Sequence, residues 1–155
     1  MRAVFYSYHL DEAAILQLVL QRAGFSPQQV QQPAKIVEVW ADRPADFVLI
    51  SFGGNFPVDI EVIEAIRAQT TVPILVIGDP LLEDPHVALL EAGADLFVER
   101  PFSVRSLVAQ IRAIMRRSAG MPFFSLPILT QSGVMIDPST RTIQVNEGEV
   151  QRLTQ

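Results

Sequence analysis

Short apolar runs alternate with stretches of helical spacing through the first 117 residues. Two runs, FVLIS at 47–51 and VPILVI at 72–77, are almost continuously apolar, as a parallel strand buried on both faces requires. The predicted strands cover 3–6, 36–40, 47–51, 72–77 and 95–98, and the predicted helices cover 10–23, 60–66, 85–92 and 104–117. This alternation predicts an α/β fold, a doubly wound five-stranded parallel sheet with right-handed crossovers.

After residue 117 the pattern becomes that of a short antiparallel β meander. The stretch SAGMP is typical of a linker. Three further predicted strands, separated by turn-forming sequences, cover 134–136, 142–145 and 150–153. About 30 residues of meander cannot bury a core of their own. We therefore expect a domain over 1–117, a linker over 118–122, and over 123–155 a segment that packs on this domain or begins a longer unit.

Composition and charge narrow the classes of partner. Of the 155 residues, 49% are hydrophobic, and the mean hydropathy is +0.28, which suits a folded core. A net charge of −5 argues against a nucleic-acid or anionic-membrane surface within these residues. The absence of cysteine from the sequence excludes disulfides and thiolate chemistry. Any contact with DNA would have to come from another part of the protein.

The sequence also carries few signals for targeting, metals or nucleotides. No apolar run approaches the roughly 18 residues of a membrane span, and the opening MRAVFYS lacks a signal-peptide cleavage site. His9 and His86 lie far apart in the sequence without a cysteine, so no metal site is expected. The glycine-rich phosphate loops and the nucleophile elbow of common α/β enzymes do not occur. We expect a soluble, cytoplasmic protein that uses no cofactor and does not bind a membrane.

Candidate chemistry is sought at the ends of the predicted strands, because doubly wound sheets bind ligands outside the carboxyl ends of their strands. The residues at these ends are Ser7, Tyr8, Ser51, Gly78, Asp79, Glu99 and Arg100. Asp11 and Glu12 begin the first predicted helix, where acidic side chains complement the helix dipole.

Several motifs carry a resemblance to a known family. EAGAD at 91–95 and ERPF at 99–102 follow the buried strands, and residues 129–154 (LTQSGVMIDPSTRTIQVNEGEVQRLT) supply a more specific match. The chain resembles a bacterial response regulator of the OmpR/PhoB type. The resemblance implies a receiver domain of flavodoxin-like fold over 1–117 and the opening β-platform of a winged-helix effector domain over 123–155. It also implies a fragment or truncated chain, because the family's DNA-reading helices would follow Gln155.

The resemblance implies that this chain has other residues at each position of the family's phosphorylation pocket. The resemblance places Ser51 where the family has its phosphoacceptor aspartate, Ser7 and Tyr8 at the two acidic positions, Gly78 at the hydroxyl position and Arg100 at the lysine position. Mg²⁺ is usually bound through carboxylates, and a serine hydroxyl without a base is a weak nucleophile. We therefore expect no Mg²⁺, no phosphoryl transfer and no enzymatic activity. Phosphorylation of Ser51 by a separate kinase stays open.

Arg100 has two interpretations. A guanidinium group carries five donors and needs acceptors. Asp79 or the pair Asp11 and Glu12 would supply them in a fixed ion pair that holds the domain in one state. Alternatively, Arg100 and the Gly53-Gly54 loop would cradle an anion.

Phe97 lies at the family's aromatic switch position. Since Gly78 offers no hydroxyl to draw this ring, the volume beside Gly78 is expected to hold Phe97 inward, in an active-like state. The alternative is that Phe97 is simply a core aromatic on a half-buried strand.

The resemblance also implies a homodimer through the fourth helix, fifth strand and fifth helix. Asp95 and Arg112 are retained at positions that would pair. Leu96, Ser106 and Gln110 replace charged residues of that face, which makes it more apolar, and exposed apolar area often marks an interface.

The expected function is phosphorylation-independent regulation and dimerisation within a two-component-type transcriptional regulator. DNA would be bound only through the winged-helix domain that this chain lacks, and the altered pocket argues against a histidine kinase as partner. Two alternatives stay open: a pseudo-receiver that senses a small ligand or anion, and a protein-interaction adaptor.

Overall fold

The structure is a computed structural model that describes residues 1–53, 59–118, 129–131, 134–137, 142–145 and 151–152. The chain divides into two compact units, Met1–Ile114 and Met115–Gln155, each with its own sheet. None of the helices in the described part of the chain combines the length and apolar character needed to cross a membrane.

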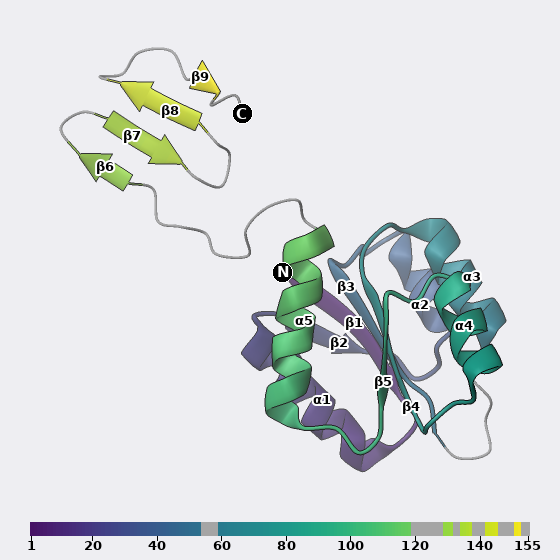
Figure 1. Cartoon of the computed structure of the whole chain (residues 1–155). Helices are drawn as coiled ribbons and strands as arrows, with labels where there is room; N and C mark the ends of the chain where they lie inside the picture. The colour runs from purple at the N-terminus through teal and green to yellow at the C-terminus, as the bar shows by residue number, and fades with distance from the viewer. Residues whose placement is uncertain (54–58, 119–128, 132–133, 138–141, 146–150, 153–155) are drawn as a thin grey trace. The chain divides into compact units, whose positions relative to one another are not determined.

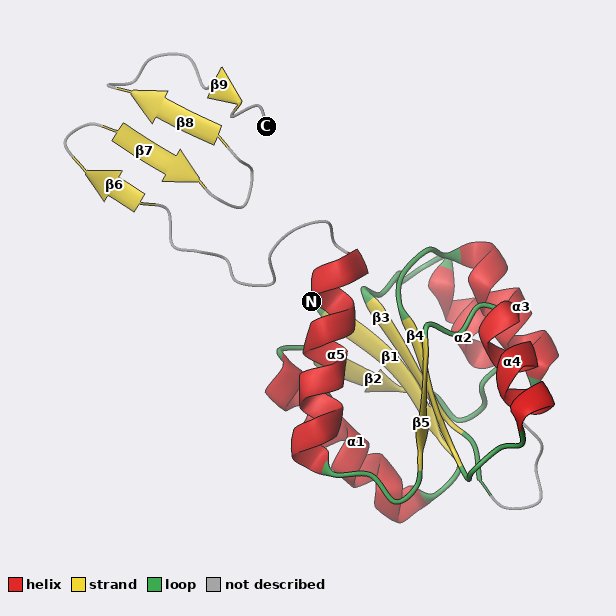
Figure 2. Cartoon of the chain, viewed as in Figure 1, coloured by secondary structure: helices red, strands yellow, loops and turns green. Residues whose placement is uncertain are grey.

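The first unit is a five-stranded parallel sheet with helices on both faces (Figure 1, Figure 2). The strands are β1 (Arg2–Ser7), β2 (Ser26–Gln29), β3 (Phe47–Ser51), β4 (Ile74–Gly78) and β5 (Leu96–Glu99), in the order β2-β1-β3-β4-β5. The helices are α1 (Leu10–Ala23), α2 (Lys35–Trp40), α3 (Ile60–Gln69), α4 (Glu83–Glu91) and α5 (Val104–Ser118). Helices α1 and α5 cover one face of the sheet, and α2, α3 and α4 cover the other. The predicted doubly wound α/β fold is confirmed.

The central strands are apolar because they have no solvent-facing side. Every residue of β3 and β4 is buried, in agreement with their continuous apolar sequences. Helix α1 contributes Leu16, Val19 and Leu20 to the interior, and Gly24 ends that helix in a left-handed conformation with φ of 99°. Buried side chains on both faces of the sheet thus hold the strand ends in place.

The strand register aligns the carboxyl ends at one edge of the sheet. Ser7 pairs with Ser51 across β1 and β3, Ser51 with Ile77 across β3 and β4, and Gly78 with Glu99 across β4 and β5. The candidate residues, far apart in sequence, therefore lie side by side.

One predicted strand was wrong. Residues 36–40 were expected as the second strand, with Trp40 at its end, but they form most of α2. Ile36 and Trp40 are buried four residues apart, which is helical spacing, while the residues between them are less buried. The second strand is instead Ser26–Gln29, whose polar sequence SPQQ is tolerated because β2 lies at the sheet edge and pairs only with β1.

The second unit contains the predicted antiparallel meander. Its strands are β6 (Leu129–Gln131), β7 (Val134–Asp137), β8 (Thr142–Val145) and β9 (Gln151–Arg152), paired in that order. Strand β6 was not predicted. The turns predicted around 138 and 147, and the linker apart from Ser118, lie outside the described residues.

Candidate functional site

Glu12, Ser51 and Arg100 form one connected cluster at the carboxyl edge of the sheet. Arg100 follows β5, and its Nε donates to Oε2 of Glu12 at 2.7 Å while its Nη2 donates to Oε1 at 2.9 Å. The same Nη2 donates to the Ser51 hydroxyl at 2.5 Å, and this hydroxyl in turn donates to Glu12 Oε1. The bidentate pair is the strongest geometry available to a guanidinium and a carboxylate.

The cluster is largely removed from solvent. Ser51 is fully buried, and the side chains of Arg100 and Glu12 are 16% and 12% exposed. Burial alone would raise the pKa of Glu12, but hydrogen bonds from Arg100 and Ser51 and the charge of Arg100 outweigh it, so the pKa of this carboxyl is lowered. Glu12 is therefore held in its ionised form.

Arg100 has a second, weaker acidic neighbour. Its Nη1 lies 3.6 Å from Oδ1 of Asp79, whose side chain is 61% exposed. Nη1 is itself buried and makes no hydrogen bond. The expectation of an ion pair across the pocket is confirmed, with Glu12 as the main acceptor and Asp79 as a minor one.

Glu12 brings a carboxylate into the pocket at a position that the resemblance does not mark. The family positions hold no carboxylate, yet one carboxylate enters from the first turn of α1. Glu12, Leu16 and Val19 share helical spacing, and the latter two are buried, so Glu12 lies on the inward side of α1. This spacing is the sequence signal that identifies Glu12; the neighbouring Asp11 is exposed.

Ser7 and Tyr8 have other surroundings. Ser7 is buried, and its hydroxyl donates to the backbone oxygen of His9 at 2.9 Å. The backbone N–H of Tyr8 donates to Ser51 O at 3.0 Å, and its half-exposed ring stands edge-on to His9. A Cβ at Gly53 would lie 2.7 Å from His9 Nε2 and 3.2 Å from Tyr8, so both rings pack on this glycine. Gly54, the other half of the suggested anion cradle, lies outside the described residues.

The donor set does not fit a divalent cation. A receiver-type pocket would hold Mg²⁺ through carboxylates, but Ser7, Tyr8 and Ser51 supply none and both oxygens of Glu12 are bound by Arg100. Elsewhere in the described residues, no cluster of three or more acidic or histidine side chains is placed to hold a metal.

Phe97 packs inward over Gly78. The ring is 9% exposed, and a Cβ added to Gly78 would lie only 3.0 Å from its Cε2 and 3.2 Å from its Cζ. His86 of α4 stacks at a tilt beside it, with ring centroids 5.2 Å apart. The absence of a side chain at residue 78 therefore provides the space that this ring fills.

The two charged residues of the predicted dimer face have partners within the chain. Asp95 pairs with Arg67 Nη2 at 2.6 Å and accepts from the N–H of Ile74 at 2.8 Å. Arg112 Nη2 donates to the backbone oxygen of Arg22 at 2.7 Å. A hollow between β5 and α5 is lined by the less polar members of that face, among them Leu96, Ser106 and Gln110.

Several transcriptional regulators are similar to this chain over most of its length. No protein-family model matches the chain. The KDP operon transcriptional regulatory protein KdpE of Escherichia coli is 31% identical over 143 residues, covering 90% of this chain and 63% of its own length. The phosphate regulon transcriptional regulatory protein PhoB of Klebsiella pneumoniae is 27% identical over 143 residues, covering 88% and 62%. This chain thus spans less than two thirds of these relatives, and the matched region includes residues on both sides of Ser118.

Solved structures agree on the fold of the first unit. An orphan response regulator of H. pylori superposes with a TM-score of 0.66 at 22% identity, covering 75% of this chain and 97% of that one. An atypical orphan response regulator, described as having a phosphorylation-independent regulatory mechanism, gives 0.65 at 22% identity, covering 75% and 96%. The homologues of this chain are OmpR/PhoB-family response regulators, and its structural neighbours are receiver domains.

Proposed function

We propose that the chain is a phosphorylation-independent regulatory domain of a two-component-type transcriptional regulator, and that it is not an enzyme. The observation that carries this proposal is the ion pair between Arg100 and Glu12. The cation at the family's lysine position already holds an internal anion, so it does not require a phosphoryl group as its partner.

The surroundings of Ser51 support the same proposal. Its hydroxyl is fully buried and is bonded to Arg100 and Glu12. A phosphodonor would have to displace this cluster to reach Ser51, and Mg²⁺ would lack the ligands needed to assist. The ionised Glu12 would also repel an incoming phosphate.

The output of the domain is proposed to be assembly on DNA. Phe97 already occupies the inward position, which suits a face that is permanently competent to dimerise through α4, β5 and α5. Two such domains in the cytoplasm would bring the winged-helix effector domains of two regulators onto paired DNA half-sites. The relatives KdpE and PhoB carry names of transcriptional regulators, which supports this role. A histidine kinase is not required as a partner.

Treatment with acetyl phosphate and Mg²⁺, followed by intact mass measurement, tests the proposal. We expect no phosphoryl addition and no change in sedimentation, with an ordinary receiver domain treated in parallel as the positive control. Addition of a phosphoryl group to this chain, or a phosphodonor-dependent change in its assembly, would contradict the proposal.

A second candidate function is the sensing of a small anion. One observation favours it, the lack of a hydrogen bond at Nη1 of Arg100. Nη1 of Arg100 is buried without a hydrogen bond, so it is a donor available to a ligand. Asp79 lies beside it and opposes an anion. Thermal shifts with phosphate and with a panel of carboxylates distinguish the two functions, because only the sensing function predicts saturable stabilisation.

A further inference from the structure

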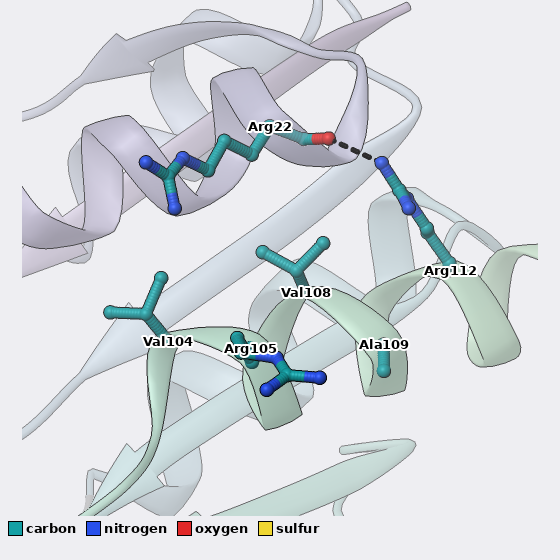
Figure 3. Close-up of a pocket in the computed structure, with 6 residues that line it drawn as sticks. All are labelled: Arg22, Val104, Arg105, Val108, Ala109 and Arg112. Atoms are coloured by element: carbon teal, nitrogen blue, oxygen red, sulfur yellow. Dashed lines mark hydrogen bonds between the residues drawn. The ribbon is translucent and has the colours of Figure 1, made fainter.

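A shallow hollow between α1 and α5 gathers three arginines around an apolar floor (Figure 3). Arg22 lies in the last turn of α1, and Arg105 and Arg112 lie on α5. The floor is formed by Val104, Val108 and Ala109. We call these six residues the α1–α5 groove.

The arginines of the groove carry uncompensated charge. All three are exposed, and within the described residues none of them forms an ion pair, whereas Lys35, Arg67 and Arg100 each pair with a carboxylate. The whole chain carries a net charge of −5. Three cations without an ion pair thus lie together around one groove of a protein that is acidic as a whole.

One of the three cations is held in position. Nη2 of Arg112 donates to the backbone oxygen of Arg22 at 2.7 Å, which also satisfies a terminal carbonyl of α1. A guanidinium has five N–H donors, so Arg112 retains donors for a partner. Figure 3 shows this bond at one end of the groove, with Val108 between it and Val104. Fixing a guanidinium before binding lowers the entropy lost in the complex.

We propose that the α1–α5 groove is a docking site for an acidic segment of another protein, one that places an apolar side chain between carboxylates. The carboxylates would meet the guanidinium groups, and the apolar side chain would cover Val104 and Val108. Charge complementarity selects this partner, because the groove presents only cations at its polar positions. The inference goes beyond the proposed function and uses none of the residues of the Arg100 cluster.

The apolar floor distinguishes this partner from a nucleic acid. A phosphodiester backbone would satisfy the arginines but would leave Val104, Val108 and Ala109 without an apolar contact.

The test uses the full chain and a helical probe peptide in which one leucine is flanked by glutamates one turn before and after it. Amide chemical shifts of the ¹⁵N-labelled chain are followed during titration. We expect saturable shifts at residues of α1 and α5 that line the groove. Arg105→Gln is expected to weaken binding about three- to fivefold, as one exposed ion pair would. Arg43→Gln, another exposed arginine without an ion pair among the described residues, is the matched control and is expected to leave binding unchanged.

A second peptide with alanine in place of the leucine tests the floor and is expected to bind more weakly. The proposal is overturned if the groove amides do not shift at millimolar peptide, if the alanine peptide binds equally well, or if Arg43→Gln matches Arg105→Gln. It is also overturned if duplex DNA binds the groove more tightly than the peptide. Self-association that Arg105→Gln abolishes would assign the groove to a second copy of the chain and would overturn it as well.

Discussion

Arg100 donates hydrogen bonds to both carboxylate oxygens of Glu12, from Nε to Oε2 at 2.7 Å and from Nη2 to Oε1 at 2.9 Å. The two residues are 88 positions apart in the sequence. The pair joins the first turn of α1 to the segment that follows β5, the edge strand of the sheet. Removing one partner leaves a poorly solvated charge on the other, and an unpaired buried charge of this kind destabilises the folded state.

Glu12→Gln is expected to lower the free energy of unfolding by about 2 kcal/mol, since the amide keeps one acceptor but loses the charge. Urea denaturation followed by circular dichroism measures this change. Asp11→Asn, at the exposed neighbour, is the matched control and should have little effect. Equal stability of Glu12→Gln and the unaltered chain would show that the ion pair contributes nothing.

The same pair predicts a pH dependence. The pKa of Glu12 is lowered from its ordinary value of 4.5, so the folded state holds the carboxylate more strongly than the unfolded state does. The stabilisation is therefore fully present above 4.5 and is lost as the pH falls through the lower folded-state pKa. The difference in urea midpoint between the unaltered chain and Glu12→Gln should be constant from pH 7 to about 5 and shrink below that. A difference that grows on acidification would contradict the assigned sign.

Gly78→Val is expected to destabilise the domain by about 2 kcal/mol through overpacking against Phe97. The second substitution Phe97→Leu should restore part of this loss, because it removes the atoms that approach residue 78 most closely. Thermal unfolding of the single and double variants measures the coupling. Purely additive effects would show that the ring does not depend on the space at Gly78.

Leu96→Asp is expected to convert the proposed homodimer to a monomer, because it places a charge at the less polar part of the β5 and α5 face. Leu18→Asp, at an exposed apolar residue of α1, is the control and should leave the dimer intact. Sedimentation of the unaltered chain at low and high salt should show a dimer in both, since an apolar interface is weakly screened. A monomer at tens of micromolar in both conditions would refute the dimer.

The central strands could be predicted from the sequence because both of their faces are buried. The edge strand β2 has an exposed side and carries no such apolar signal. Strands β3 and β4 are recognisable in the sequence as apolar runs. Strand β2 has the polar sequence SPQQ, which has no hydrophobic pattern that would distinguish it from a loop. In its place the pattern predicts a strand over the mostly apolar stretch 36–40, which includes the exposed Glu38. A short run of this kind fits a strand or a buried helical face equally well until its neighbours in space are known.

The candidate site was predictable in its location and only partly in its contacts. The register of parallel strands brings Ser7, Ser51 and Gly78 to one edge, as expected from their positions. Which acidic residue would meet Arg100 depended on the rotation of α1 about its axis. Three candidates were open, and the packing of Leu16 and Val19 selected Glu12.

The Glu12 carboxylate beside Ser51 also constrains how this pocket can change by mutation. Placing an aspartate at residue 51 by itself would set two negative charges in contact within a buried space, at a cost to folding. Removing Glu12 first would leave Arg100 with only the weaker, exposed partner Asp79. Each single step is therefore unfavourable, and introducing a phosphate-accepting aspartate at this site would require several substitutions made together.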